Sequence, residues 1–402
     1  MEMGDNLPSR YHYEQTLIQV VLSLKSLSVQ GGEPFQWYQT MRQIEPIHYN
    51  AQYNLWELFR YVDVWQVAFD YNTFSSEVSG PKTENRPIHT TLVQMDPPRH
   101  RQLRSLVSQA FTPRTITRLT PRITDTTYKL LDAVASHNNM DVVSDLSDPL
   151  PVIIIAELLG VPTVDYRQLK FWTNAITGLD FNESVQSQAE METYFLEVIE
   201  QRRTQPKDDL ISNLLAVSVE GHPISQMELL GFCMSLLIAG NETTTNLIAN
   251  AILCFAEHPE VIPLLRTNSN LLPGAIEEVL RYRSPIQVMP RIAKVDTSIG
   301  GQVIKRGDWL LGWIGSANRD GMEFSSPEDF DIKRTPNRHL AFGYGSHACL
   351  GAPLARLEAK IALEAMIKRF AIIQLVPNIP LEKIGSDFVY GMRHLPITFQ
   401  LM

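Results

Sequence analysis

A glycine-rich run that ends in a lone cysteine and continues into an apolar stretch constrains this chain more than any other segment. The run is HLAFGYGSHACLGAPLARLE, residues 339–358, with the spacing F-G-x-G-x-H-x-C-x-G. The alanines and leucines after Gly351 predict a buried helix. A cysteine beside a helix start lies near unpaired N–H groups and the positive end of the helix dipole, which favour a thiolate. Gly351 leaves room for a flat ring, so Cys349 is a candidate metal ligand; an ordinary buried cysteine is the alternative.

The composition excludes several classes of protein. The formal net charge of −9 over 402 residues gives no reason to expect a nucleic-acid partner. Cys233 and Cys254 fall inside apolar runs and form no disulfide framework, so we expect a reducing compartment and a cytoplasmic location. No apolar run reaches the roughly 18 residues that a membrane span needs. The best candidate, 17–27, lacks the features of a signal peptide, and we expect an amphipathic helix lying on the protein.

A long apolar helix is predicted from a capping box, Ser225 followed by Glu228, to about Glu257. Its middle is interrupted by the polar run AGNETTT, residues 239–245. Glycine, a carboxylate and three threonines are poor choices for the centre of a buried helix, so the run indicates a kink or a site. Threonines that only bond back to the helix are the alternative.

Two shorter patterns predict charged pairs on helices. His100 and Arg104 are four apart after Asp96-Pro97-Pro98, with Asp96 as the expected N-cap, so they share a face suited to carboxylates. Glu278 and Arg281 are three apart on another helix, which alone would usually mean a surface ion pair.

The remaining elements are expected as follows. We predict helices over 151–159, 169–177 and 191–199, a polar linker over 178–187, a long loop over 77–92, strands between 292 and 314, and a hairpin over 388–399.

The four motifs resemble those of the cytochromes P450, in family order and spacing, from about residue 34 to the end of the chain. The resemblance implies that Cys349 is the axial thiolate of haem b, shielded by Phe342, with Gly351 giving the ring room. It also implies propionate contacts from four side chains, namely His100, Arg104, Arg291 and His347. Ala239 and Gly240 would border a groove for dioxygen, in which Thr243 and Glu242 handle hydrogen bonds and protons.

The same resemblance implies the architecture. We expect a mainly α fold with a smaller β-rich part, the triangular prism of the family, made of a leader over 1–33 and one catalytic domain over 34–402. Glu278 and Arg281 take a structural role, with Arg338 or, preferably, His339 as third member. The helices around 178–187 would form a lid. The substrate pocket is expected to be bordered by Leu92, Leu236, Leu237, Ile286, Val288, Met289, Phe388 and Val389.

The implied activity is a monooxygenase that inserts one atom of O2 into a C–H bond of a hydrophobic small molecule, such as a steroid, terpenoid, fatty acid or polyketide. Electrons would come from NAD(P)H through a ferredoxin or flavodoxin and its reductase, docking on Arg101, Arg356 and Lys360. Three alternatives stay open: a peroxygenase that uses H2O2, a non-catalytic haem-thiolate binding or sensor protein, and a structural protein without haem.

Overall fold

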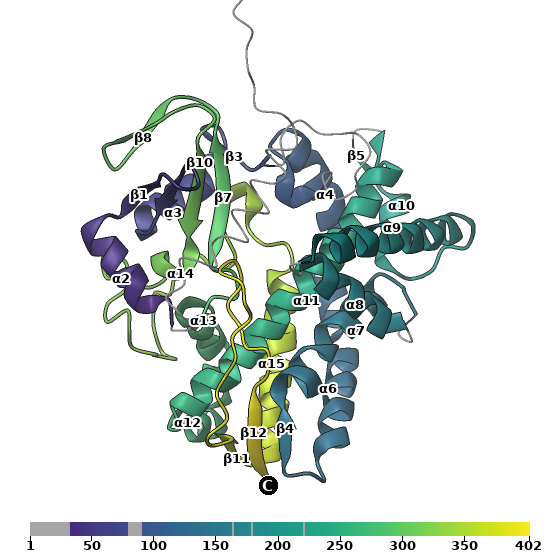
Figure 1. Ribbon diagram of the computed structural model, residues 1–402. Helices are drawn as coiled ribbons and strands as arrows, with labels where there is room; N and C mark the ends of the chain where they lie inside the picture. The colour runs from purple at the N-terminus through teal and green to yellow at the C-terminus, as the bar shows by residue number, and fades with distance from the viewer. Residues whose placement is uncertain (1–32, 79–90, 163–164, 178–179, 220–221) are drawn as a thin grey trace, which may run out of the picture.

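Helices form the larger part of the protein, in a computed structural model that describes residues 33–78, 91–162, 165–177, 180–219 and 222–402. The expected leader apart from Glu33, the helix over 17–27 and most of the loop over 77–92 lie outside the described residues. The main helices are α4 (Arg99–Ala110), α6 (Thr120–Val134), α7 (Pro149–Leu158), α8 (Tyr166–Thr177), α9 (Phe181–Thr204), α11 (Gln226–Glu257), α13 (Leu272–Tyr282) and α15 (Ala352–Arg369). Figure 1 shows α11 crossing the middle of this body with α15 beside it. The predicted mainly α architecture is confirmed.

The central helix α11 begins as predicted. The Ser225 side chain accepts from the Glu228 N–H, and the Glu228 carboxylate accepts from the Ser225 N–H, so the capping box forms on both sides. The helix runs for 32 residues and ends before His258. It packs on α7, α9, α13 and α15, which places its polar middle at the centre of the helical body.

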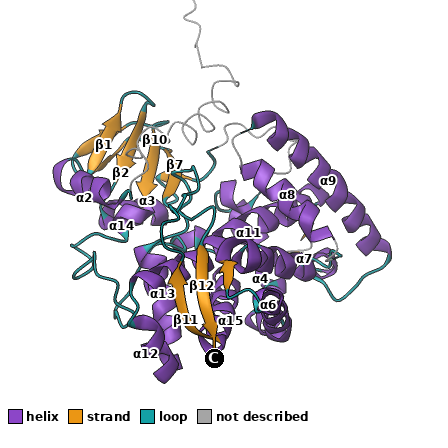
Figure 2. Cartoon of the chain, turned by 60° about the horizontal axis from the view of Figure 1, so that its bottom comes forward, coloured by secondary structure: helices purple, strands orange, loops and turns teal. Residues whose placement is uncertain are grey.

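A five-stranded sheet lies to one side of the helices (Figures 1 and 2). Its order is β1-β2-β10-β7-β3, with bounds Ile47–Asn50, Leu55–Leu58, Trp309–Trp313, Val288–Ala293 and Phe74–Ser75. Alternate residues of β10 face opposite clusters: Trp309, Leu311 and Trp313 pack with Tyr38 of α2 (Phe35–Ile44), and Leu310 packs with residues of α3 (Tyr61–Phe69). The small hairpin β8–β9 (Thr297–Ile299, Gln302–Ile304) completes the strands expected between 292 and 314.

The C-terminal strand pairing differs from the prediction. Residues 388–399 form no hairpin; β12 (Pro396–Leu401) pairs instead with β11 (Phe370–Leu375) and β4 (Asn139–Asp141). Val389 makes only an isolated bridge with Ile286. Strand β4 comes from a distant part of the chain, and residues 376–395 separate β11 from β12, so a local alternation of apolar residues over 388–399 cannot reveal either pairing.

Two other local predictions were wrong. Helix α9 begins at Phe181, capped by the Asp180 carboxylate, so residues 181–187 are helical rather than part of a polar linker. Asp96 does not cap α4; its carboxylate accepts from the Ser75 hydroxyl at 2.7 Å and the Ser76 N–H at 3.0 Å. The carboxylate of an aspartate before two prolines can accept hydrogen bonds from the following helix or from another segment, and spacing in the sequence does not show which donors it binds.

Among the helices of the described residues, none is by itself both long enough and apolar enough to cross a membrane. Only α11 and α12 (Val261–Thr267) taken together meet those criteria, and they meet at 105°.

Candidate active site

The cysteine loop is held open by two glycines in left-handed conformation. Gly343 has φ +67° and Gly345 has φ +68°, angles that disfavour side chains with a Cβ. The Cys349 N–H donates to the Phe342 carbonyl at 2.8 Å and closes the loop, after the single turn Gly345–His347. Helix α15 begins three residues after the cysteine, with Gly351 as its N-cap residue. The predicted glycine turn, cysteine and helix are therefore confirmed.

The sulfur of Cys349 lies where the backbone of the helix start can bond to it. The N–H groups of Gly351 and Ala352 donate to it, and Arg104 and Arg356 are close enough to favour its negative form. Burial among protein atoms nevertheless outweighs these groups and raises the pKa of the Cys349 thiol, although part of the side chain stays accessible. The helix start alone does not hold a thiolate here. A bound metal ion would, because coordination removes the thiol proton.

Two histidines with unpartnered ring nitrogens lie beside this loop. The rings of His100, on α4, and His347, in the loop, have centroids 4.3 Å apart. Both nitrogens of His100 and Nε2 of His347 are buried and find no hydrogen-bond partner among the described residues. Burial and the charge of Arg104 lower the pKa of His100 to about 4, and burial and Arg291 lower that of His347 to about 3. Both rings are therefore neutral at pH 7, and buried polar atoms without partners indicate a site for a bound group.

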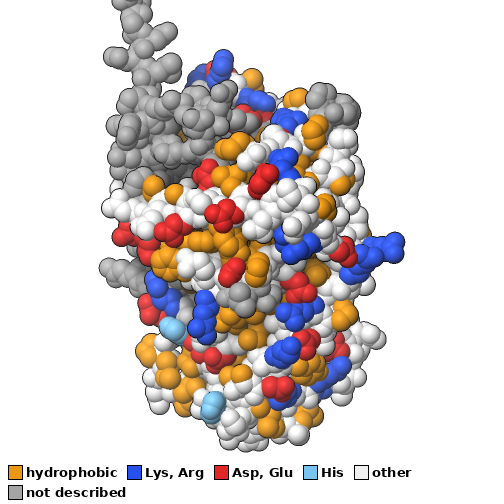
Figure 3. All heavy atoms as spheres, turned by 90° about the vertical axis from the view of Figure 1, so that its right-hand side faces the viewer, with side chains coloured by type: hydrophobic (Ala, Val, Ile, Leu, Met, Phe, Trp, Pro, Cys, Tyr) orange, Lys and Arg blue, Asp and Glu red, His pale blue; other side chains and the backbone are white. Residues whose placement is uncertain are grey.

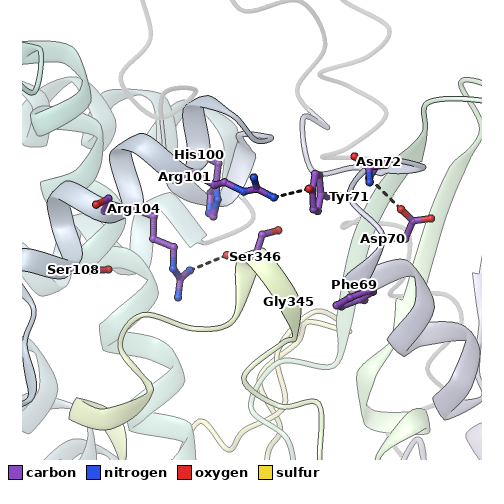
Figure 4. A pocket seen from close by; sticks show the side chains of 11 residues that line it. Phe69, Asp70, Tyr71, Asn72, His100, Arg101, Arg104, Ser108, Gly345 and Ser346 are labelled. Carbon is purple, nitrogen blue, oxygen red and sulfur yellow. Dashed lines mark hydrogen bonds between the residues drawn. The ribbon is translucent and has the colours of Figure 1, made fainter. Parts of the chain in front are cut away.

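Arg291 and Arg104 both lower the pKa of His347, but their own hydrogen-bond partners differ. Arg291, on β7, donates through Nη1 to the carbonyl of Pro290 at 2.8 Å, and burial lowers its pKa to about 10. Arg104, on α4, instead bonds the cysteine loop itself. It donates to the carbonyl of Ser346 at 3.1 Å (Figure 4) and to that of Ala348 at 2.6 Å. It thus fastens α4 to the loop, and its contact with a cofactor carboxylate stays a prediction.

A hydrogen bond in the polar middle of α11 bears on the two interpretations of its threonines. The Thr243 hydroxyl donates to the carbonyl of Ala239 at 2.6 Å, the back-bonding that was the alternative to a role with oxygen. Its oxygen keeps acceptor capacity for a further group. A Cβ on Gly240 would lie 2.5 Å from Cδ1 of Ile155, so this glycine lets α7 approach α11. Ala239 and Gly240 bordering an oxygen groove remains a prediction.

Glu242 stands in a group of charges that sequence analysis missed. Burial raises the pKa of Glu242, Lys170 opposes this effect, and Asp148 adds to it. Lys170 on α8 and Asp148 before α7 form an ion pair with each other. One residue earlier, the Asn241 amide donates to the Thr173 hydroxyl of α8 at 3.1 Å. Lys170, Asp148 and Thr173 are far from Glu242 in sequence and carry no motif that could have pointed to them.

Glu278 and Arg281 form a fully buried pair, with both side chains at 0% exposure and bonds of 2.8 and 2.7 Å. The expected third member was wrong. Arg334 and Asn337 reach the Glu278 carboxylate at 3.1 Å, whereas His339 bonds to the neighbouring Glu277 at 3.2 Å. The pair therefore ties α13 to the segment before the cysteine through Arg334.

The apolar residues expected to border a substrate fall into two groups. Leu237 and Val288 are 0% and 1% exposed and pack in the hydrophobic core, where they present no surface to a ligand. Val389 is also buried, and the others are half-buried, namely Leu92, Leu236, Ile286, Met289 and Phe388. The contact of these six with a substrate stays a prediction.

The chain is similar in sequence and in structure to known proteins of one family. The family model described as cytochrome P450 matches residues 152–390. The chain is 42% identical over 371 residues to the putative cytochrome P450 YjiB of Bacillus subtilis, covering 90% of this chain and 92% of that protein. The crystal structure of substrate-free CYP109E1 from Bacillus megaterium covers 92% of this chain and 99% of its own, at 42% identity and a TM-score of 0.89. Its complex with testosterone gives 43% identity and a TM-score of 0.86, over 91% and 97% of the two chains.

Proposed function

The chain belongs to the cytochrome P450 family of monooxygenases, and on that premise we propose that it inserts one atom of O2 into a C–H bond of a steroid-like substrate. The observation that carries the proposal is the cysteine loop beside the unpartnered histidine nitrogens. Cys349 offers one soft donor to a metal, and His100 and His347 offer buried nitrogens that have no hydrogen-bond partner within the described part of the chain. An iron porphyrin with its carboxylates matches both requirements at once.

These residues fit haem b. Cys349 would ligate the iron, and His100, His347 and Arg291 would hold the propionates, with Arg104 fastening the loop against α4. The chain contains no C-x-x-C-H run of the kind that attaches haem covalently, which supports a haem held by these contacts alone. When bound, the cofactor supplies the oxygen-activating chemistry, and the protein binds, orients and supplies protons.

Proton supply is assigned to Glu242 and Thr243. The raised pKa of Glu242 keeps a larger share of this carboxyl protonated near neutral pH than an exposed glutamate would have. Thr243 is the next residue along the helix. Its hydroxyl oxygen can accept a hydrogen bond from a proton donor while its O–H donates to the carbonyl of Ala239. The ion pair of Lys170 with Asp148 carries charge close to Glu242 and helps to set its proton affinity.

The substrate class follows from apolar pocket residues and from the relatives. Half-buried Leu236, Ile286, Met289 and Phe388 supply apolar edges without a charge to pair a polar ligand. The structure of CYP109E1 with testosterone supports a steroid, and that of P450BioI with an acyl carrier protein bearing a fatty acid keeps a fatty acid as second choice. Electrons are proposed to come from NAD(P)H through a separate acidic ferredoxin or flavodoxin and its reductase, in the cytoplasm.

The proposal is tested with testosterone as probe, purified holoprotein, a ferredoxin with its reductase, NADPH and isotopically labelled O2. We expect a product one oxygen atom heavier, with the label taken from O2. If labelled H2O2 supports turnover and the ferredoxin route does not, the protein is a peroxygenase, an outcome that the presence of Glu242 and Thr243 argues against. If the probe shifts the haem spectrum but no product forms by either route, the protein is a binding protein.

A further inference from the structure

Two segments that are expected to border the substrate pair with each other beside α11. They are residues 285–287 and 388–390, and we call them together the ribbon. Two backbone hydrogen bonds of 2.8 and 2.9 Å join them, from the N–H of Tyr390 to the carbonyl of Pro285 and from the N–H of Gln287 to the carbonyl of Phe388. Figure 1 shows the C-terminal part of the chain, in yellow, reaching the lower end of β7, where this pairing lies. The two segments therefore move, or stay in place, as one unit.

One side chain of α11 holds both segments of the ribbon. The Asn250 amide nitrogen donates to the carbonyl of Tyr390, in one segment, at 3.2 Å, and to the carbonyl of Arg283, two residues before the other segment, at 3.1 Å. Asn250 is 0% exposed. Only the amino end of the amide can bond two carbonyl oxygens, so both of its hydrogens are used and its orientation is fixed. Loss of this side chain would remove a donor from two buried carbonyls at once.

Asn250 also fixes the ribbon relative to Thr243. Seven residues make almost two full turns of an α-helix, so Thr243, Asn250 and Glu257 lie on one face of α11, each about 10 Å from the next along the axis. The Glu257 carboxylate accepts from the Arg283 guanidinium at 3.1 Å. The start of the ribbon is thus held at two points of the face that carries Thr243, and the register of α11 sets its distance from that threonine.

The ribbon continues in direct contact with α11. Gly391 follows it, and a Cβ at that position would overlap the side chain of Asn246, one turn before Asn250. Asn246 is 1% exposed, and its two amide atoms have no hydrogen-bond partner within the described parts of the chain. Of the two asparagines, Asn246 therefore contributes packing at this junction, and Asn250 contributes the hydrogen bonds.

The other side of the ribbon is fastened to the sheet region. The Tyr38 hydroxyl of α2 donates to the Gln287 side-chain oxygen at 2.8 Å, and the Gly315 N–H donates to the Gln287 carbonyl at 3.1 Å. Side chains alternate along an extended segment, so Gln287 turns toward α2 and Ile286 turns the other way. With anchors on both sides, the position of Ile286 follows from where the ribbon is held.

We propose that Asn250 is a positioning residue: by holding the ribbon on α11 at a fixed distance from Thr243, it determines which C–H bond of the substrate is oxidised. The inference rests on the proposed function, in which Thr243 serves the oxygen chemistry and Ile286 and Phe388 border the substrate. Asn250 is fully buried and acts through the ribbon. An apolar pocket orients its ligand mainly by shape, and a misplacement of about 1 Å can change a rate about a hundredfold.

The test compares Asn250→Leu, which keeps a similar shape but has no donor, with the wild-type holoprotein in two assays. Hydrogen exchange followed by mass spectrometry measures the anchoring and needs no turnover. Peptides that cover the ribbon should exchange at least about tenfold faster in the variant. Product analysis with testosterone, a ferredoxin with its reductase and NADPH measures the consequence. The ratio of the monohydroxylated isomers should change at least about fivefold.

Arg266→Met is the control for a general loss of stability. The Arg266 guanidinium joins α12 to the end of α15 by donating to the carbonyls of Ile367 and Phe370, which are bonds of the same kind away from the ribbon. This variant should change neither the exchange of the ribbon nor the product ratio.

Two further readouts separate the ribbon from other causes. All variants should keep the carbon monoxide band of the wild type, which shows that the cofactor is bound. Because Asn250 is buried, its replacement leaves the protein surface unaltered, including the face in Figure 3, where acidic, basic and apolar side chains of the described residues are interspersed. Altered docking of an electron donor therefore does not account for a new product ratio.

Unchanged exchange of the ribbon in Asn250→Leu, or an unchanged product ratio once the exchange has risen, overturns the proposal. An equal shift of the product ratio in Arg266→Met does the same. If Asn250→Leu does not fold, Asn250→Asp decides by the same criteria, because its side chain has the same shape and at most one donor hydrogen. If the wild type forms no product from testosterone or from a long-chain fatty acid, the proposed function is contradicted instead, and the exchange measurement alone decides whether Asn250 anchors the ribbon.

Discussion

Glu277 and Glu278 are adjacent in sequence, but Glu278 is fully buried and Glu277 is partly exposed. The same substitution at both positions therefore tests how much burial raises the cost of removing a paired charge. Glu278 is fully buried and accepts from Arg281 at 2.7 and 2.8 Å, from Arg334 at 3.1 Å, and from the N–H of Asp331 at 2.9 Å. One carboxylate thus balances two guanidinium groups. In Glu278→Gln the charge is lost, and the new amide group points donors at donors.

The expected costs follow from that difference. Removing one member of a buried ion pair leaves an uncompensated charge, so Glu278→Gln should lower the free energy of unfolding by about 3–5 kcal/mol. Glu277 also has two partners, Arg356 and His339, which help to lower its pKa to about 2 against the effect of burial. Its side chain is 30% exposed and that of Arg356 is 40% exposed, so solvent screens the pair and Glu277→Gln should cost only about 1 kcal/mol.

The assay is urea unfolding of the two variants and the wild-type holoprotein, followed by far-ultraviolet circular dichroism at pH 7. We expect a clear gap between the variants at unchanged m values; failure of Glu278→Gln alone to yield folded protein would agree with it. Equal costs at the two positions, or a larger cost for Glu277→Gln, would refute the assignment of Glu278 as the charge centre that joins α13 to the cysteine segment.

Three further predictions concern Glu358, Glu242 and Gly240. Burial raises the pKa of Glu358 to about 8, so the folded state binds a proton that the unfolded state releases above its ordinary pKa of 4.5. Stability should therefore fall as pH rises from about 4.5 to 8, and Glu358→Gln should remove this slope in urea titrations; an unchanged slope would contradict it. Glu242→Gln should reduce the amount of product formed per NADPH consumed. In the wild type this yield should fall as pH rises through the raised pKa of Glu242, and the variant should not show this fall. Equal yields in the two proteins would exclude Glu242 from proton supply. Gly240→Ala should cost about 1–3 kcal/mol through its contact with Cδ1 of Ile155, and Ile155→Val, which lacks that carbon, should relieve the cost in a double-mutant cycle; additive effects would contradict the contact.

What the sequence predicted well was local or rigidly spaced. The capping box at Ser225, the glycine turn before Cys349 and the helix after it all depend on residues within a few positions of each other, and all are confirmed. Such features depend on the allowed backbone conformations and on the capping of helix ends, and a short run of residues determines both.

What the sequence did not predict depends on how distant segments meet. Arg334 rather than His339 completes the Glu278 cluster, because the path of the loop from 331 to 339 decides which side chain arrives. Lys170 reaches the neighbourhood of Glu242 only because α8 crosses α11. The pKa of Cys349 likewise reflects burial by the whole fold, which outweighs the helix start visible in the sequence.

The central claim is that the sulfur of Cys349 ligates a haem iron as a thiolate. The direct measurement is the absorption spectrum of the purified, haem-supplemented protein after reduction under carbon monoxide, for the wild type and for Cys349→Ser. We predict the strongly red-shifted Soret band of thiolate ligation in the wild type and its loss in the variant. A wild-type protein that stays colourless, or a variant that keeps the same band, would contradict the account.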